Sequence, residues 1–214
     1  MRKLLFLGLL TVSLLWAGEL TSTGFIYPLK GGLSVLRHGD FGTSFSEGYG
    51  HPGKWHCGVD WAAPVGTPVY AVADGVVMKI SHLGWSENED SETARTNFAY
   101  LIEHRLADGK SFFAVYGHLK RPWELEAGQR VKAGQLIGFV GPWKKAPHLH
   151  FAIFMAEDGR GDYPESAYGM QPLPRPEKRL IAGVTAYPSV KEAEVHPGFW
   201  FDPGEFLRRR FPGQ

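Results

Sequence analysis

Short apolar runs separated by polar turns fill most of the chain between residues 68 and 155. Each run is rich in valine, isoleucine or aromatic residues, and glycine-containing turns such as residues 73–75 and 107–109 separate them. Runs of this length with such boundaries indicate β-strands and not helices. We therefore expect an all-β fold of two packed antiparallel sheets, a hybrid of sandwich and barrel. The expected strands are residues 68–72, 76–80, 98–104, 112–116, 130–131, 136–140 and 148–155.

The segments around this region are less regular. Residues 27–37 alternate loosely between apolar and polar positions, which predicts an early strand before a glycine-rich loop over residues 39–53. Residues 84–96 and 157–198 are rich in charge or in proline and glycine, and we interpret both as loop insertions. Residues 203–211 carry three arginines near their end, which suit the last turn of a short C-terminal helix.

The beginning of the chain has the pattern of a secretory signal peptide. Two basic residues precede an apolar run over residues 4–16, and Ala17 supplies a small residue after it. A bilayer is spanned by about 20 apolar residues, and this run is shorter. We expect a signal peptide over residues 1–17 and a single domain over residues 18–214, exported to the periplasm, the cell envelope or the outside. A retained membrane anchor is the alternative.

The composition fits a folded protein without a nucleic-acid partner. Hydrophobic residues make up 43% and charged residues 21% of the 214 residues, as in ordinary globular domains. Removal of residues 1–17 changes the formal charge from +1 to −1. No excess of positive charge therefore favours nucleic acid or an anionic membrane surface. We expect a monomer that is not inserted in a membrane once it is processed.

His148 and His150 form the first candidate pair for a metal or catalytic site. They begin a predicted strand, where positions i and i+2 lie on one face about 7 Å apart. Both imidazoles would then point into one site, with one binding a metal ion and the other beside it. The structural alternative is two polar residues on the exposed face of a half-buried strand.

His56 and Asp60 form the second pair. On a straight strand they would lie about 13 Å apart, which is too far for one ion. A bend at Gly58 would let them converge while Cys57 points elsewhere. Cys57 is the single cysteine, so it is a free thiol, an intermolecular partner or a buried small hydrophobe, the last being commonest.

The remaining histidines give weaker signals. His118 follows an apolar run where a strand leaves a predicted hairpin. The others lie near strand ends or in loops, where a solvated or hydrogen-bonded histidine is the ordinary interpretation. They are His38, His51, His82, His104 and His196.

Several ordered motifs together resemble one family. They are HCGVDWAAPVGTPVYAVADGVV (residues 56–77), FFAVYGHLK (112–120), EAGQRVKAGQLIGFVG (126–141), APHLHFAIF (146–154) and FDPGEFL (201–207). The first resembles a His-x-Gly-x-Asp block with its following strand pair, and the fourth resembles an HLHF strand. In this order the motifs resemble the lysostaphin/LytM-type zinc metalloendopeptidases, which cut peptidoglycan peptides. The resemblance covers residues 33–207, interrupted by the two insertions.

The resemblance implies a role for five residues. His56, Asp60 and His150 would bind one zinc ion, and His118 and His148 would be catalytic, flanking a water molecule and the scissile carbonyl. Three protein ligands and an open fourth position suit a catalytic zinc ion. The implied activity is an exported zinc-dependent endopeptidase that hydrolyses peptide bonds in peptidoglycan stem or crosslink peptides.

The chain departs from the family's pattern at three places. Residues 41–44 lack the usual arginine or asparagine, residues 142–146 (PWKKA) replace the usual Gly-x-Ser-x-Gly, and Ala152 replaces a glutamate. These changes leave the five site residues intact and alter the walls of the zinc groove. Four aromatic residues could line that groove or pack in the core: Trp55, Trp61, Tyr116 and Trp143.

Two alternatives of other classes follow from the same sequence. A catalytically silent relative would bind peptidoglycan or activate another cell-wall hydrolase, although such relatives typically lose zinc ligands and this chain has lost none. A biotinyl or lipoyl carrier domain would carry its covalent modification on Lys79. That residue, however, lies inside an apolar run and not at a hairpin tip.

Overall fold

The computed structural model describes residues 25–31, 33–36, 39–45, 52–82, 98–120, 125–143, 146–157, 159, 170–172, 174–189 and 197–210. The predicted signal peptide and the predicted insertion over residues 84–96 lie outside these ranges.

Within the described residues the chain forms thirteen strands and one helix, and the strands pair antiparallel. All seven predicted strands have an observed counterpart, which confirms the all-β prediction. The elements are β1 (Lys54–His56), β2 (Gly58–Ala62), β3 (Pro68–Tyr70), β4 (Gly75–His82), β5 (Phe98–Arg105), β6 (Ser111–Lys120), β7 (Arg130–Val131), β8 (Leu136–Val140), β9 (His148–Ala156), β10 (Met170–Pro172), β11 (Arg179–Ile181), β12 (Val184–Pro188), β13 (Gly198–Phe201) and α2 (Pro203–Arg210).

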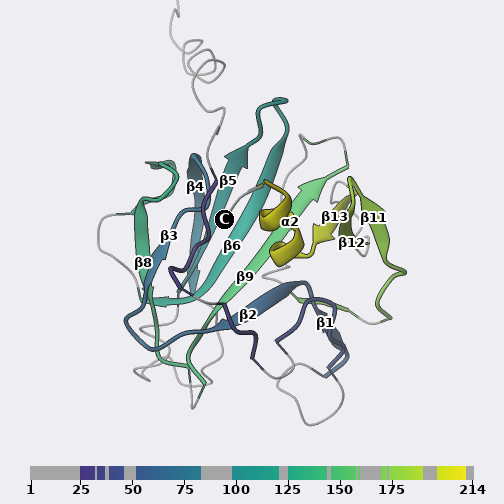
Figure 1. The fold of residues 1–214 in the computed structure, drawn as a ribbon, viewed down its shortest axis with the longest axis horizontal. Helices are drawn as coiled ribbons and strands as arrows, with labels where there is room; N and C mark the ends of the chain where they lie inside the picture. The colour runs from purple at the N-terminus through teal and green to yellow at the C-terminus, as the bar shows by residue number, and fades with distance from the viewer. Residues whose placement is uncertain are drawn as a thin grey trace, which may run out of the picture.

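An 11-stranded sheet forms most of the molecule, in the order β11-β12-β13-β9-β6-β5-β4-β7 (Figure 1). Three further strands branch from this path: β2 pairs with β9, and β8 pairs with both β6 and β3. Strands β1 and β10 form a separate two-stranded sheet. Strand β9 therefore has β6 along one edge, and β2 and β13 along the other.

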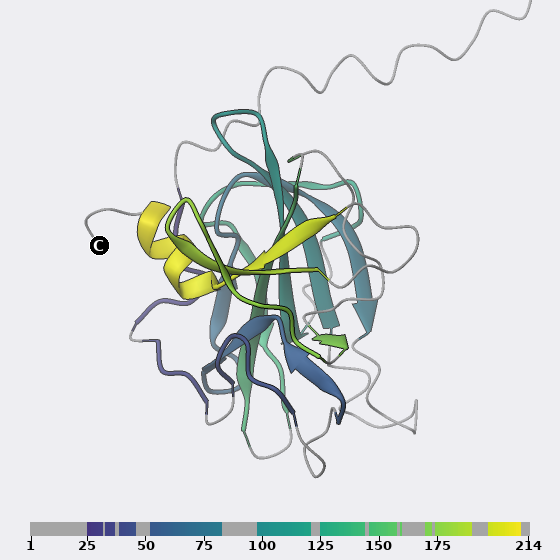
Figure 2. The ribbon, with the colours of Figure 1, turned by 90° about the vertical axis from the view of Figure 1, so that its right-hand side faces the viewer.

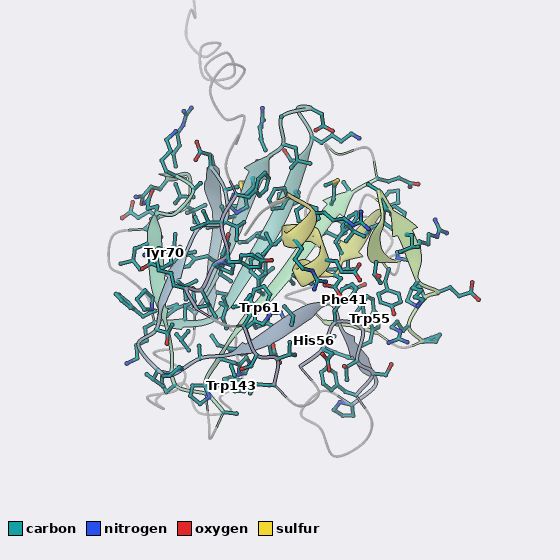
Figure 3. The ribbon with its side chains drawn as sticks, in the orientation of Figure 1. Phe41, Trp55, His56, Trp61, Tyr70 and Trp143 are labelled. Atoms are coloured by element: carbon teal, nitrogen blue, oxygen red, sulfur yellow. The ribbon has the colours of Figure 1, made fainter. Side chains whose placement is uncertain are left out.

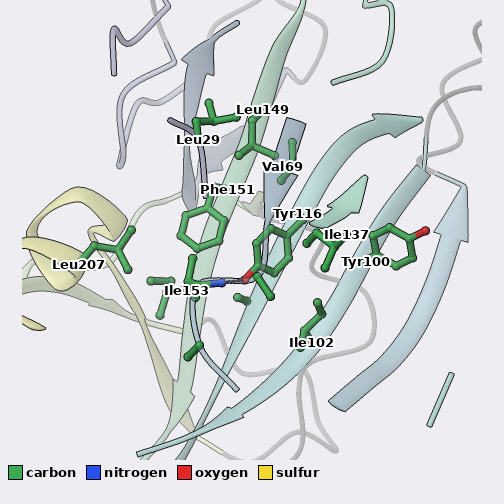
Figure 4. Packing of buried hydrophobic residues seen from close by; sticks show 14 of the residues in the cluster. Leu29, Val69, Tyr100, Ile102, Tyr116, Ile137, Leu149, Phe151, Ile153 and Leu207 are labelled. Carbon is green, nitrogen blue, oxygen red and sulfur yellow. Dashed lines mark hydrogen bonds between the residues drawn. The ribbon is translucent and has the colours of Figure 1, made fainter. Parts of the chain in front are cut away.

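The branch formed by β3 and β8 makes a second layer over the sheet. Val69 of β3 and Ile137 of β8 are fully buried in the same cluster as Tyr100 and Tyr116 from the sheet (Figure 4). The backbone N–H of Val72 donates a hydrogen bond of 3.0 Å to the Tyr116 hydroxyl, which joins the layers. Full burial of side chains of this size contributes about 1.5–3 kcal/mol each, so this interface is a large part of the core.

Helix α2 packs on the face of the sheet that carries this core (Figure 2). Its start is capped because the Asp202 carboxylate accepts a hydrogen bond of 2.9 Å from the backbone N–H of Glu205. Phe206 and Leu207 are buried in the core cluster. The C-terminal helix expected from the sequence is thus confirmed, and within the described residues no helix is long and apolar enough to cross a membrane.

Two segments differ from their predicted structure. The described part of residues 27–37 forms no strand. Its backbone makes a single β-bridge, Val35 to Trp61, and its other backbone hydrogen bonds to β2 and β3 are isolated. Residues 157–198, expected as a loop insertion, contain strands β10, β11 and β12. The hairpin from β11 to β12 turns at two residues with positive φ, Ala182 and Gly183.

Both faces of β9 are buried, and this explains why its sequence reads as one apolar run. Its odd-numbered and even-numbered residues alternate between two core clusters, as expected for a strand. His148 and His150 occupy the even-numbered face, at the end of the strand where its core cluster stops. One cluster takes Leu149, Phe151 and Ile153, and the other takes Ala152, Phe154 and Ala156.

Candidate active site

The pairing of β2 with β9 places Asp60 directly opposite His150. His56 joins them because the chain changes partner between β1 and β2: β1 pairs with β10, Cys57 breaks the strand, and β2 pairs with β9. The bend predicted near Gly58 is therefore a switch from one sheet to the other. It brings His56 and Asp60 together although they are four residues apart on an extended chain.

The ligand atoms of these three residues lie close enough to hold a single metal ion. Asp60 Oδ1 lies 2.9 Å from His150 Nδ1 and 3.4 Å from His56 Nε2. The two ring nitrogens lie 3.0 Å from each other. All three atoms fall within 4.8 Å of one another. Two imidazole nitrogens and one carboxylate oxygen are a donor set that suits zinc and leaves a position open.

Backbone groups of residues 39–43 hold this arrangement in place. The carbonyl of Asp40 accepts a hydrogen bond of 3.2 Å from His56 Nδ1, and Nε2 of the same ring faces the other candidate ligands. The backbone N–H of Asp60 donates to the carbonyl of Gly39 at 2.9 Å. A Cβ at Gly39 would stand 2.7 Å from Cβ of Asp60, so this approach requires glycine. These contacts were not predictable from the sequence, because every residue carries a carbonyl group.

His148 and His118 lie beside the three candidate ligands. His148 Nε2 is 3.6 Å from Asp60 Oδ1. Its Nδ1 donates a hydrogen bond of 2.7 Å to the carbonyl of Ala146, which fixes the ring and its tautomer. The His118 ring lies with its centroid 4.6 Å from that of His148 and 6.1 Å from that of His150. All five residues named from the sequence therefore gather in one place.

A β-bulge directs His118 into this place. Between the pairs Tyr100–Tyr116 and Phe98–Leu119, strand β6 has one more residue than β5. His118 has a φ of 60°, in the left-handed region that non-glycine residues rarely adopt. Tyr116 and Leu119 both lie in the same core cluster. The extra residue between them therefore takes His118 out of the regular alternation of side chains between the two faces of the strand.

Burial and neighbouring charges shift the pKa values of three site residues. Burial alone would raise the pKa of the Asp60 carboxyl, but His56 and His150 outweigh it and hold that pKa well below its ordinary value. Burial lowers the pKa of His150, and Asp60 opposes this in part. Burial, reinforced by His148 and His150, holds the pKa of His118 well below its ordinary value. These shifts favour a carboxylate at Asp60 and neutral imidazoles at His118 and His150 near pH 7. For Asp60 and His150 these are the forms that bind a metal ion.

The other candidates from the sequence have structural roles or lie outside the described residues. Cys57 is buried in a core cluster, as expected for a packing residue, and burial raises the pKa of its thiol. His104 is buried and hydrogen-bonded to the Asp74 carbonyl and the Tyr116 hydroxyl. Three histidines lie outside the described residues: His38, His51 and His196. The side chain of His82 is not described.

Of the four aromatic residues considered for the groove, three are buried in the core. Trp55 and Tyr116 are 0% exposed and Trp61 is 3% exposed, whereas Trp143 is partly exposed beside the histidines. A separate hollow of about 770 Å³ lies against Val59 and Trp61, on the face of β2 opposite Asp60. None of the five site residues lines it.

Comparisons with known proteins agree on one family. A sequence model described as Peptidase family M23 matches residues 54–161. The chain is 38% identical over 104 residues to "Peptidoglycan DD-endopeptidase ShyC" of Vibrio cholerae, covering 48% of this chain and 21% of that protein. It is 36% identical over 118 residues to "Glycyl-glycine endopeptidase ALE-1" of Staphylococcus capitis, covering 50% of this chain and 29% of that protein.

Among solved structures, the catalytic domain of the antimicrobial peptidase lysostaphin from Staphylococcus simulans is similar to this chain. The identity is 28% and the TM-score is 0.41, with 62% of this chain and 84% of that chain covered. The matched region spans about a fifth to a third of the curated relatives named above.

Proposed function

The chain belongs to peptidase family M23, and on this premise we propose that it is an exported, zinc-dependent endopeptidase that hydrolyses peptide bonds in peptidoglycan. Family membership confirms the resemblance to lysostaphin/LytM-type enzymes found in the sequence. One observation carries the proposal: the ligand atoms of His56, Asp60 and His150 converge, with His118 and His148 beside them.

The donor set supports zinc as the metal. Two nitrogen ligands and one oxygen ligand match catalytic zinc sites, and the three atoms come from three strands, β1, β2 and β9. The carbonyl of Asp40 orients His56, as outer hydrogen bonds commonly do for metal-binding histidines. His150 Nε2 is buried and has no hydrogen-bond partner within the described residues, so Nδ1 makes the polar contacts of that ring.

When bound, zinc would supply Lewis acidity for the scissile carbonyl and make a water molecule a better nucleophile at neutral pH. The chain's own histidines would assist the transfer of the proton from the attacking water. His148 Nδ1 donates to Ala146, so its Nε2 is available to accept a proton from the attacking water. His118, whose ring lies beside that of His148, would donate a hydrogen bond to the oxygen on which negative charge develops. His148 would pass the accepted proton to the leaving amine.

Peptidoglycan is supported as the substrate by the names of the relatives. ShyC is named a peptidoglycan DD-endopeptidase and ALE-1 a glycyl-glycine endopeptidase. The apolar segment over residues 4–16, with its basic start, supports export to the compartment where peptidoglycan lies. We assign to this chain the cleavage of stem or crosslink peptides, with one zinc ion per chain and a monomer as the working form.

The test is digestion of purified, crosslinked peptidoglycan sacculi by residues 18–214. Muropeptides would be resolved by chromatography and mass spectrometry, with and without a zinc chelator and beside the His148→Ala variant. We expect loss of crosslinked species that the chelator abolishes and the variant lacks. A folded, zinc-loaded protein that cuts no bond would overturn the proposal and favour a silent relative that binds peptidoglycan or activates another hydrolase.

A further inference from the structure

The Trp143 indole lies against the His118 imidazole in a tilted arrangement, and the segment that carries Trp143 also contacts His148. The centroid of its indole lies 4.1 Å from the imidazole centroid of His118, with 33° between the ring planes. The same indole lies 6.2 Å from His148 at 89°. Figure 3 labels Trp143 below β2, on the part of the molecule where His56 is also labelled.

The backbone around Trp143 is tied to both histidines. The N–H of Gly141 donates a hydrogen bond of 2.7 Å to the carbonyl of His118. The N–H of Ala146 donates at 3.0 Å to the carbonyl of Trp143, and the carbonyl of Ala146 in turn accepts from His148 Nδ1 at 2.7 Å. The connection between β8 and β9 therefore makes a hydrogen bond to His118 and another to His148. It also contacts the His118 ring through the indole of Trp143.

The orientation of His118 depends on more than its backbone. Its bulged, left-handed conformation directs the side chain out of the strand, and ring rotation about the side-chain bonds would still change where its nitrogens point. An indole at 4.1 Å restricts that rotation because the two flat rings lie within contact distance. Misplacement of a catalytic group by about 1 Å can reduce a rate by about 10²-fold.

We propose that Trp143 is a positioning residue that holds the His118 imidazole in its catalytic orientation. The assignment rests on the proposed function, in which His118 faces the reacting carbonyl. Trp143 acts through His118 and has no metal-ligating atom. Its loss should therefore lower turnover while the binding of zinc and of substrate stays unchanged.

The kinetic test compares Trp143→Ala and Trp143→Phe with the zinc-loaded mature chain on soluble, crosslinked muropeptides. We expect kcat of Trp143→Ala to fall roughly 10- to 100-fold with KM and zinc content unchanged. Trp143→Phe should restore most of the turnover because it keeps a flat ring. Tyr70→Ala is the matched control: Tyr70 is partly exposed, contacts Lys30 and is labelled beside β3 in Figure 3, away from His56.

An NMR measurement tests the same contact without substrate. The imidazole proton signals of His118, assigned by their loss in His118→Gln, should be shifted upfield by the indole ring in the zinc-loaded protein. They should move downfield in Trp143→Ala and stay in place in Tyr70→Ala. Unmoved signals in Trp143→Ala would overturn the ring contact on which the proposal rests.

The outcomes separate this proposal from the proposed function. An active wild type whose Trp143→Ala variant keeps its kcat would overturn the positioning role alone. A rise in KM with unchanged kcat would also overturn it, since Trp143 would then contact substrate and not orient His118. A wild type that is folded, zinc-loaded and inactive would instead overturn the peptidase assignment, whatever the NMR signals show.

Discussion

Gly58 lies directly against the imidazole of His150. A Cβ at Gly58 would stand 2.8 Å from His150 Cε1, 2.7 Å from the Phe151 carbonyl oxygen and 3.0 Å from the Ala152 Cβ. Gly58 does not have positive φ, so its role is close approach and not backbone freedom. The absence of a side chain lets β2 lie close to β9 and lets Asp60 reach His150.

The first prediction is that Gly58→Ala damages both stability and the metal site. The added methyl group meets backbone on β9, which cannot move without shifting His150, so we expect a loss of about 1–3 kcal/mol in the free energy of unfolding. Zinc affinity should fall as well. Denaturant unfolding and zinc titration measure the two effects. Gly204→Ala, near the start of helix α2, is the control, because a Cβ there would make only an ordinary contact of 3.4 Å with Asp202 Oδ1 and should be neutral or stabilising.

The second prediction concerns the strained backbone at His118. With a φ of 60°, this position favours glycine over alanine by roughly 1 kcal/mol, in contrast to the usual order in a strand. We expect His118→Gly to be more stable than His118→Ala in denaturant unfolding, and both to lack turnover. A more stable alanine variant would show that the left-handed conformation is absent in solution.

The third prediction concerns the distinct roles of the two histidines on β9. His150→Ala should lose zinc, whereas His148→Ala should keep zinc and lose about 10²- to 10⁴-fold in turnover. Zinc at about 100 times its Kd should stabilise the wild type and His148→Ala by about 2.7 kcal/mol and leave His150→Ala unaffected. Equilibrium dialysis and thermal unfolding with and without zinc provide the measurements. Equal loss of metal in both variants contradicts the assignment.

The fourth prediction concerns stability at acid pH. Burial lowers the pKa of His104 to about 4, below the ordinary value of about 6.5 that it has when unfolded. Because the folded state favours the neutral ring, the unfolded state takes up a proton first as the pH falls. The contribution of His104 to the free energy of unfolding is complete above about pH 6.5. It falls by roughly 3 kcal/mol at most between pH 6.5 and 4.

This pH dependence is measured by unfolding after chelation, in the wild type and in His104→Gln. Glutamine retains groups able to bond to Asp74 and Tyr116 but does not titrate in this range. The wild type should lose stability more steeply than the variant from pH 6.5 downward. Parallel curves would mean that His104 is not buried in the neutral form.

The central strands were predictable because their apolar runs are continuous. Strand β9 is buried on both faces, and its HLHFAIF sequence shows this directly. The strands of residues 157–198 were not predicted because β10 and β11 are three residues long, and the partner of β10 is β1, far away in the chain. Such pairing is decided by tertiary packing and not by local sequence.

The five candidate residues were recognisable in the sequence, but what orients them was not. The distance problem between His56 and Asp60 is solved by a change of strand partner, which requires the position of β10. The acceptors at Asp40 and Ala146 are main-chain carbonyls without a residue signature. Trp143 was one of four possible groove aromatics, and only burial distinguishes it from the others.

His56 and His150 are 94 positions apart, and β9 is the last of the site's strands to leave the ribosome. An incomplete chain that ends before β9 holds His56 and Asp60 without their third partner. Such a chain lacks both the complete candidate metal site and His148, the proposed proton acceptor. If the proposed activity holds, hydrolytic competence requires β9, which pairs with both β2 and β6, and a fragment that ends before β9 should be inert.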